Sequence, residues 1–107
     1  MTKKKKTLIL RPYLILKGVV FLLYYAVFDD AVKCYMNPFP ARSDGEALRE
    51  FGFAVNNVNT SINAHPHDFH LYKVGEFDDR KGTFVPLDSP PVFLSHAADW
   101  QKVGEDS

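Results

Sequence analysis

The segment from Ser43 to Asn59 constrains the fold of this chain most. Ser43-x-x-Glu46 is a capping box, in which the serine hydroxyl accepts a hydrogen bond from the backbone N–H of Glu46 while that carboxylate reaches back. Apolar residues then recur every three or four positions: Ala47, Leu48, Phe51, Ala54, Val55 and Val58. This spacing predicts a helix with one buried stripe, although Gly52 weakens it by about 1 kcal/mol relative to alanine. Asn56, Asn57 and Asn59 end it, because asparagine tolerates the left-handed conformation of a C-cap.

A hairpin pattern precedes this helix. Leu22–Phe28 is rich in β-branched and aromatic residues, which strands prefer. Asp29-Asp30-Ala31 is a turn signal, and Val32–Asn37 is again strand-like. Pro38 and Pro40 end this second strand, because proline cannot donate to a β-ladder.

A second hairpin pattern follows the helix after a polar connection from Thr60 to Asp68. Phe69–Phe77 and Thr83–Leu87 are the predicted strands, and residues 78–82 form the turn between them. Phe77-Asp78-Asp79 occupies the same place before its turn as Phe28-Asp29-Asp30 in the first hairpin. Residues after Leu94 are weakly patterned.

Together these elements predict an α+β fold in which two β-hairpins flank one amphipathic helix (ββαββ). The helix packs on one face of a four-stranded antiparallel sheet, whose strand order the sequence does not give. The 107 residues fit one domain. We assign residues 1–20 to a basic and apolar N-terminal extension, 21–100 to the domain and 101–107 to a disordered tail.

The net charge of zero hides an asymmetry between the two ends of the chain. Residues 1–20 hold no acidic group and six basic ones: Lys3, Lys4, Lys5, Lys6, Arg11 and Lys17. Residues 21–107 hold seven basic groups against thirteen acidic ones, a net charge of −6. Clustered basic groups bind phosphates by releasing counterions. Residues 1–20 could therefore supply affinity for nucleic acid, whereas residues 21–107, with their net negative charge, could do so only through a local basic patch.

The apolar stretch from Leu8 to Phe28 resembles a signal peptide or membrane anchor. Arg11 and Lys17 interrupt it, and the longest uncharged run, Gly18 to Phe28, has eleven residues, whereas a spanning helix needs about 20. We therefore interpret its second half as a buried strand, with a membrane-associated segment as the alternative.

Two clusters are candidates for metal or acid–base chemistry. His65, His67, His70 and Asp68 could ligate a transition metal, but Pro66 stiffens the segment and strand alternation turns His70 away from Asp68. The acidic pairs at 29–30 and 78–79 could bind magnesium or act as acid and base. Adjacent aspartates in a hairpin turn more often hydrogen-bond the turn backbone. We expect neither cluster to be a metal or catalytic site.

Nothing else in the sequence indicates an enzyme. Cys34 is the only cysteine, which excludes an intrachain disulfide and suits a reducing compartment. It could be a nucleophile, but buried cysteine commonly serves as a small hydrophobe. No G-x-S-x-G, P-loop, H-E-x-x-H or dinucleotide motif is present. We predict a protein without catalytic activity and without a cofactor.

Aromatic residues on the predicted strands could build a surface for nucleic acid: Tyr24, Tyr35, Phe69, Tyr72, Phe77 and Phe84. Exposed rings on a sheet stack unpaired bases, each worth ~1–3 kcal/mol. The alternative is that half of them face the helix as core and the rest stabilise cross-strand pairs. On the residues alone, the alternative is favoured.

The region from Leu23 to Leu87 resembles the small nonstructural protein of gokushoviruses, which are tailless single-stranded-DNA phages of the Microviridae. The most specific match is Ala41-Arg42-Ser43 with Gly45-Glu46-Ala47 at the helix start. The other matching elements are Asp29, Pro38-Phe39, Phe51, His65-Pro66, Asp68, Gly75-Glu76-Phe77-Asp78 and Pro86-Leu87. Members usually begin close to the first strand, so the family's function is not projected onto residues 1–20.

The resemblance implies a phage protein made during infection, in the host cytoplasm and outside the mature virion. It implies a role in genome replication or packaging, with single-stranded DNA or the viral replication complex as partner and a homo-oligomer as a further option. We predict weak, non-specific binding of single-stranded DNA. The candidate contacts are Lys3, Lys4, Lys5, Lys6, Arg42, Arg49, Tyr72 and Lys73. The alternative is an interaction module that acts on a viral or host protein without touching nucleic acid.

Overall fold

The computed structural model describes residues 21–102, and its centre is an antiparallel sheet of six strands. Strands β1 (Phe21–Asp29) and β4 (Phe69–Asp78) form its long central pair. The outer edge of β1 carries β2 (Cys34–Tyr35) at one end and β3 (Phe39–Ala41) at the other. The outer edge of β4 carries β6 (Val92–His96) and β5 (Thr83–Pro86) in the same way. The sheet therefore runs β2-β1-β4-β6 at one end and β3-β1-β4-β5 at the other.

The antiparallel sheet and its one main helix are confirmed, but the four-strand count and the ββαββ order are wrong. The segment predicted as one strand, Val32–Asn37, pairs only at Cys34 and Tyr35. The backbone turns at Lys33, whose φ is 62°, and the chain leaves the sheet before Phe39. It returns as β3, where Pro40 is tolerated because the strand lies at an edge. Strand β6, after Pro90 and Pro91, was not predicted at all.

Helix α1 (Asp44–Asn56) begins after the predicted cap Ser43 and ends at Asn56, before Val58, the last residue of the predicted stripe. Ser43 Oγ accepts a hydrogen bond from the Glu46 N–H at 3.1 Å. The Glu46 carboxylate accepts from the N–H of Arg42 at 2.6 Å, one residue earlier than a standard capping box requires. The expected left-handed C-cap is wrong: Asn57 is extended, with φ −87°, and its N–H donates to the carbonyl of Ala54.

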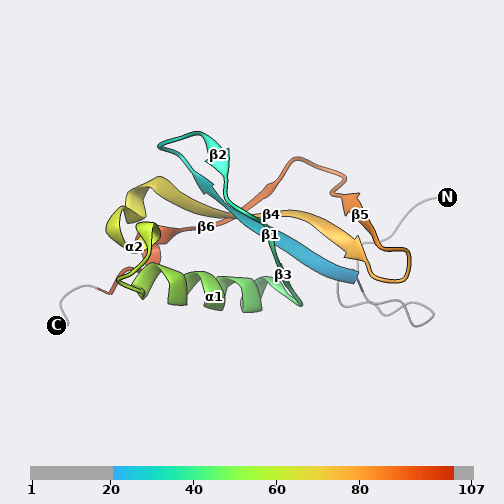
Figure 1. Cartoon of the computed structure of the whole chain (residues 1–107), viewed down its shortest axis with the longest axis horizontal. Coiled ribbons are helices and arrows are strands. Elements are labelled where there is room, and N and C mark those ends of the chain that lie inside the picture. The colour runs from blue at the N-terminus through green and yellow to red at the C-terminus, as the bar shows by residue number, and fades with distance from the viewer. Residues whose placement is uncertain (1–20, 103–107) are drawn as a thin grey trace.

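One face of the sheet packs against α1, which lies along it in Figure 1. Alternate residues of β1 and β4 project to this face, as the two-residue period of a strand requires. They meet the predicted stripe of α1 as far as Val55, whereas Val58 lies beyond the helix and is 80% exposed. The core consists of Leu23, Tyr25, Val27, Ala41, Ala47, Phe51, Val55, Ile62, Phe69, Leu71 and Ala97.

Gly52 has a packing role that the sequence pattern did not show. A Cβ at this position would lie 2.7 Å from Cε3 of Trp100. The indole belongs to the 3₁₀ turn η2 (Ala97–Trp100), and its Nε1 donates to Ser95 Oγ at 2.9 Å. The side-chain amide of Asn56 also donates to the carbonyl of Trp100 at 3.0 Å. Glycine thus lets the C-terminal turn sit directly on the helix.

The connection from α1 to β4 is partly regular. It contains the short helix α2 (Ser61–Ala64), capped by Thr60, and the 3₁₀ turn η1 (Pro66–Asp68). Between residues 21 and 102, no helix is both long and apolar enough to cross a membrane. The N-terminal extension predicted for residues 1–20 lies outside the described residues, and so does the part of the predicted tail from 103 to 107.

Candidate nucleic-acid interface

The face of the sheet opposite α1 is lined mainly by aromatic rings. Phe28 is in register with Tyr35 and His70, Tyr72 with Phe93, and Phe77 with Phe84. Residues in register project to the same side of a sheet, and Val27 and Leu71, which alternate with them, are buried on the α1 side. We call this surface the aromatic face; its members are Tyr24, Phe28, Tyr35, His70, Tyr72, Phe77, Phe84, Phe93 and His96.

The rings form two groups that hold one another in position. At the β2–β6 end, Tyr35 contacts Phe28 and Tyr72 at centroid distances of 4.9 and 5.7 Å, and Tyr72 contacts Phe93 at 5.7 Å. At the other end, Phe84 contacts Tyr24 at 5.1 Å and Phe77 at 4.9 Å. Most of these pairs are edge-to-face, the arrangement that aromatic quadrupoles favour. The rings are therefore ordered before any ligand arrives.

This aromatic surface is accessible. Phe84 is 66% exposed, and Tyr35 and Phe93 are each 44% exposed. His96 is also exposed, and the other rings of the face are half-buried by their neighbours. Contiguous exposed apolar surface of this kind marks an interaction site more often than a chance feature.

A hollow of about 470 Å³ opens at the β2–β6 end of the aromatic face. Its lining residues are Phe28, Asp30, His70, Tyr72, Phe93 and His96. The Nδ1 atoms of His70 and His96 lie 2.9 Å apart and share a hydrogen bond. Asp30 accepts a hydrogen bond from Lys33 Nζ at 2.6 Å, and this bond and the lysine charge lower the pKa of the Asp30 carboxyl. Burial, followed by the neighbouring Tyr72, raises the pKa of Tyr35.

The acidic residues within the described strands lie away from the aromatic face, whereas Asp30, in the turn that follows β1, lines its hollow. Within the strands they occur at Asp29 and Asp78, which end β1 and β4, and at Glu76, which is in register with the buried Leu23 on the α1 side. Asp29 Oδ1 accepts from the N–H of Ala31 at 3.0 Å. Asp78 Oδ1 accepts from the N–H of Arg80 at 3.0 Å, so the predicted backbone role of these turn aspartates is confirmed.

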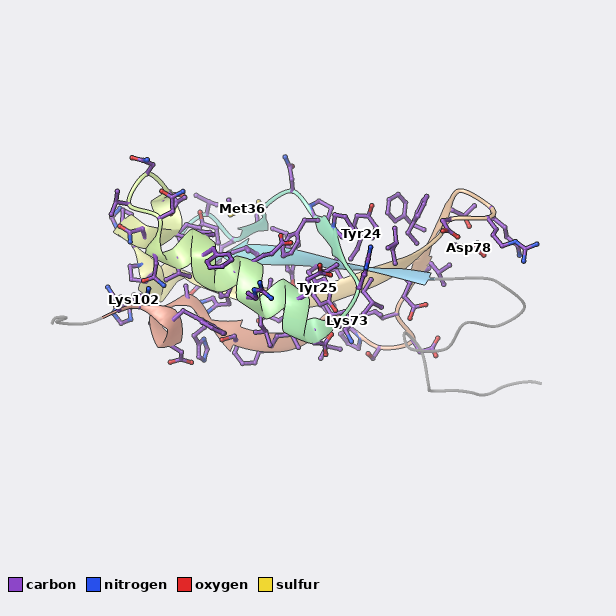
Figure 2. All side chains as sticks on the ribbon, turned by 90° about the horizontal axis from the view of Figure 1, so that it is seen from below. Tyr24, Tyr25, Met36, Lys73, Asp78 and Lys102 are labelled. Atoms are coloured by element: carbon purple, nitrogen blue, oxygen red, sulfur yellow. The ribbon has the colours of Figure 1, made fainter. Side chains whose placement is uncertain are left out.

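The structure separates the residues predicted to bind DNA. Tyr72 lies on the aromatic face, but Lys73 projects to the other side. Lys73 Nζ lies 3.0 Å from Asp44 Oδ1, which also accepts from the Tyr25 hydroxyl at 2.6 Å. Figure 2 shows Tyr25 and Lys73 close to the end of α1 that follows β3. Arg42, which lies just before α1, and Arg49, which lies on it, are both exposed. Lys3, Lys4, Lys5 and Lys6 lie outside the described residues.

Sequence reasoning missed three members of the hollow. Phe28 was assigned to a buried strand, Phe93 lies in the strand that was not predicted, and His96 lies in the region described as weakly patterned. Their grouping depends on strand pairing between distant segments, and no local signal indicated it.

The histidine cluster predicted at residues 65–70 is divided by the fold. His65 lies between α2 and η1, His67 is exposed on η1, and His70 pairs with His96 on the aromatic face. Within residues 21–102, no three histidine, cysteine, aspartate or glutamate side chains are placed so that they could hold a metal ion. Cys34 is exposed on β2 rather than buried.

Comparisons with known proteins relate the sequence of this chain to phage proteins. The family described as "Phage ORF5 protein" matches residues 22–100. Protein ORF5 of Chlamydia phage 1 is 28% identical over 83 residues, which cover 74% of this chain and 86% of that protein. No solved structure matches. These findings support the resemblance to Microviridae-type phages at the level of a phage protein. The chain belongs to the Phage ORF5 protein family.

Proposed function

We propose that this phage protein binds single-stranded DNA, weakly and with little sequence preference, through the aromatic face of its sheet. The observation that carries the proposal is the surface opposite α1, on which two groups of ordered rings lie together. Asp30, in the turn after β1, lines the hollow beside one of these groups. Proteins that bind single strands without reading sequence combine stacking rings with a basic path for the backbone.

Strand-borne rings suit this task because every base has a π-face. Tyr72 lies between Tyr35, Phe28 and Phe93, with centroid distances of 5.7, 6.4 and 5.7 Å. Neighbouring rings hold its plane, so little side-chain entropy is lost when a base stacks on it. Each stacked base contributes ~1–3 kcal/mol.

The charge of the protein limits the affinity. Residues 21–107 carry a net charge of −6, which repels a polyanion at low salt. Lys81 lies in the turn at one end of the aromatic face and could contact phosphates there. Lys33, in the turn at the other end, is paired with Asp30. Lys3–Lys6, in the N-terminal extension, add four further positive charges. We therefore expect binding that is weak and strongly dependent on salt.

Membership of a phage family supports a role during infection. Single strands are exposed while a single-stranded genome is copied and packaged, so we place the protein at that stage, in the host cytoplasm and outside the mature virion. We propose that it acts by binding and carries out no catalysis.

A salt series tests this function. Anisotropy of labelled single-stranded oligonucleotides should show binding at low salt that falls as salt rises. For single strands, the slope of log K against log salt changes by about 0.7 per phosphate contact. Replacing Lys3–Lys6 with alanine should therefore flatten the slope by up to ~3. Tyr72→Ala should weaken binding about 5-fold or more and leave the slope nearly unchanged.

The second candidate function is an interaction module for a viral or host protein. The exposure of Phe84, Tyr35 and Phe93 favours it, because aromatic residues are also enriched in protein interfaces. The absence of single-strand binding at high-micromolar protein, for the wild type and for the Lys3–Lys6 variant, would favour this second function over the first.

A further inference from the structure

The hollow on the aromatic face combines stacking surfaces with polar groups. Phe28, Tyr72 and Phe93 contribute rings, and Asp30, His70 and His96 contribute hydrogen-bonding atoms. Sites for small planar ligands are built in this way, from an apolar lining and a few convergent polar groups that fix orientation. An unpaired nucleobase is a ligand of that kind.

The rings of the hollow are steeply inclined to one another. The Tyr72 plane is 71° from that of Phe93 and 81° from that of Phe28. A base that stacks flat on Tyr72 therefore meets the neighbouring rings with its edge. Tyr35 is also inclined to Tyr72, by 80°, so none of these three neighbouring rings offers a second stacking plane parallel to that of Tyr72.

The histidine pair offers both kinds of hydrogen-bonding atom. In the neutral pair one Nδ1 donates to the other, so one histidine keeps an Nε2 acceptor and its partner keeps an Nε2–H donor. The two tautomers can exchange these roles. The histidine pair can thus hydrogen-bond to any base, so it contributes little to a preference for one base over another.

Asp30 is the group of the hollow whose hydrogen bonding differs from one base to another. Its carboxylate only accepts hydrogen bonds, and its contact with Lys33 holds it in place and in the charged form. A carboxylate repels a phosphate and attracts an amino group, as in the contacts that Asp and Glu make with cytosine N4. Cytosine, adenine and guanine carry an exocyclic amino group and thymine carries none.

We propose that the hollow lined by Phe28, Tyr72, Phe93, His70, His96 and Asp30 binds one unstacked base of the single strand and prefers bases with an exocyclic amino group over thymine. This inference rests on the proposed function and adds to it a modest base preference. The phosphates then lie outside the hollow, away from Asp30.

Two pyrimidine oligonucleotides test the preference without the strong self-stacking of purines. Full-length protein should bind oligo-dC about threefold to tenfold more tightly than oligo-dT at the same low salt, the range expected of one hydrogen bond. Asp30→Asn should bring this ratio close to one, because an amide can satisfy either base. Asp79→Asn is the matched control: it removes the same charge from the exposed turn at the other end of the sheet. It should leave the ratio unchanged.

The outcomes separate the two proposals. Equal affinity of the wild type for oligo-dC and oligo-dT, or the same ratio in Asp30→Asn as in Asp79→Asn, contradicts the base preference while single-strand binding stands. A failure to bind either oligonucleotide contradicts the proposed function and the base preference with it.

Discussion

The two faces of the sheet are built from alternate residues of the same strands, yet they lie in different surroundings. On the α1 side, Leu23, Tyr25 and Leu71 are at most 1% exposed. On the opposite side, Phe28 and Tyr72 are half-buried and Phe84 is 66% exposed. Both faces are apolar, so composition does not distinguish them. The helix does, because it covers only one of them (Figure 1).

This difference separates stability from binding. Burial of apolar surface contributes roughly 25 cal/mol per Å², and the covered face gains this on folding. On the aromatic face, part of the apolar surface stays exposed to water until a ligand covers it, so its burial contributes to binding rather than to folding. Substitutions on the covered face should therefore lower the free energy of unfolding, whereas those on the aromatic face should mainly weaken binding.

The largest effect is expected at the centre of the covered face. Phe51 is 2% exposed, and Phe51→Asp should destabilise the domain by more than about 4 kcal/mol, because it loses the ring and buries an unpaired charge. Phe53, two residues along the same helix, is 68% exposed. Phe53→Asp should cost less than about 1 kcal/mol. Equal thermal midpoints of the two variants would show that α1 does not cover the sheet through Phe51.

The next effect concerns the contact between α1 and the C-terminal turn. Gly52→Ala should lower stability by about 1–3 kcal/mol, because the new Cβ would lie 2.7 Å from Trp100. Gly45→Ala in the same helix meets only Ser43 Oγ, at 3.8 Å. This control should be neutral or stabilising by up to ~1 kcal/mol. Urea denaturation of the two variants measures both values, and a stabilising Gly52→Ala would exclude the close packing of the indole.

A smaller effect is expected at the start of α1. Ser43→Ala removes the acceptor for the Glu46 N–H and should cost about 1 kcal/mol. Ser61 is exposed at the first residue of α2 and does not cap it, since Thr60 does. Ser61→Ala should change the urea midpoint little. If Ser43→Ala also left the urea midpoint unchanged, the Ser43 hydroxyl would not be stabilising the start of the helix.

Local chemistry made part of this fold predictable. The cap at Ser43, the stripe from Ala47 to Val55 and the Asx turns at Asp29 and Asp78 depend on residues within a few positions of each other. The sequence therefore placed the start of the helix and the capping aspartates of both turns correctly, but not the C-cap of the helix. It also identified Tyr72 as a residue available for stacking, although it left open whether the strand rings face the core.

What could not be predicted depends on pairing between distant segments. Register shifts in β4 between Lys73 and Gly75 and in β6 between Ser95 and Phe93 interrupt the strict alternation of strand residues. No local pattern places Phe93 beside Tyr72 or His96 beside His70. Lys73 shows the same difficulty: its partner, Asp44, comes from another element, 29 positions earlier.

The central claim is that the aromatic face, and not exposed aromatic residues in general, binds single-stranded DNA. Phe84 on the sheet and Phe53 on α1 are 66% and 68% exposed, which makes them a matched pair on opposite layers. Each alanine variant should lose little stability, and their oligonucleotide affinities can be compared at the same low salt. Phe84→Ala should weaken binding about 5-fold or more, and Phe53→Ala should leave it unchanged. Equal affinities for the two variants would contradict the assignment of DNA binding to this face.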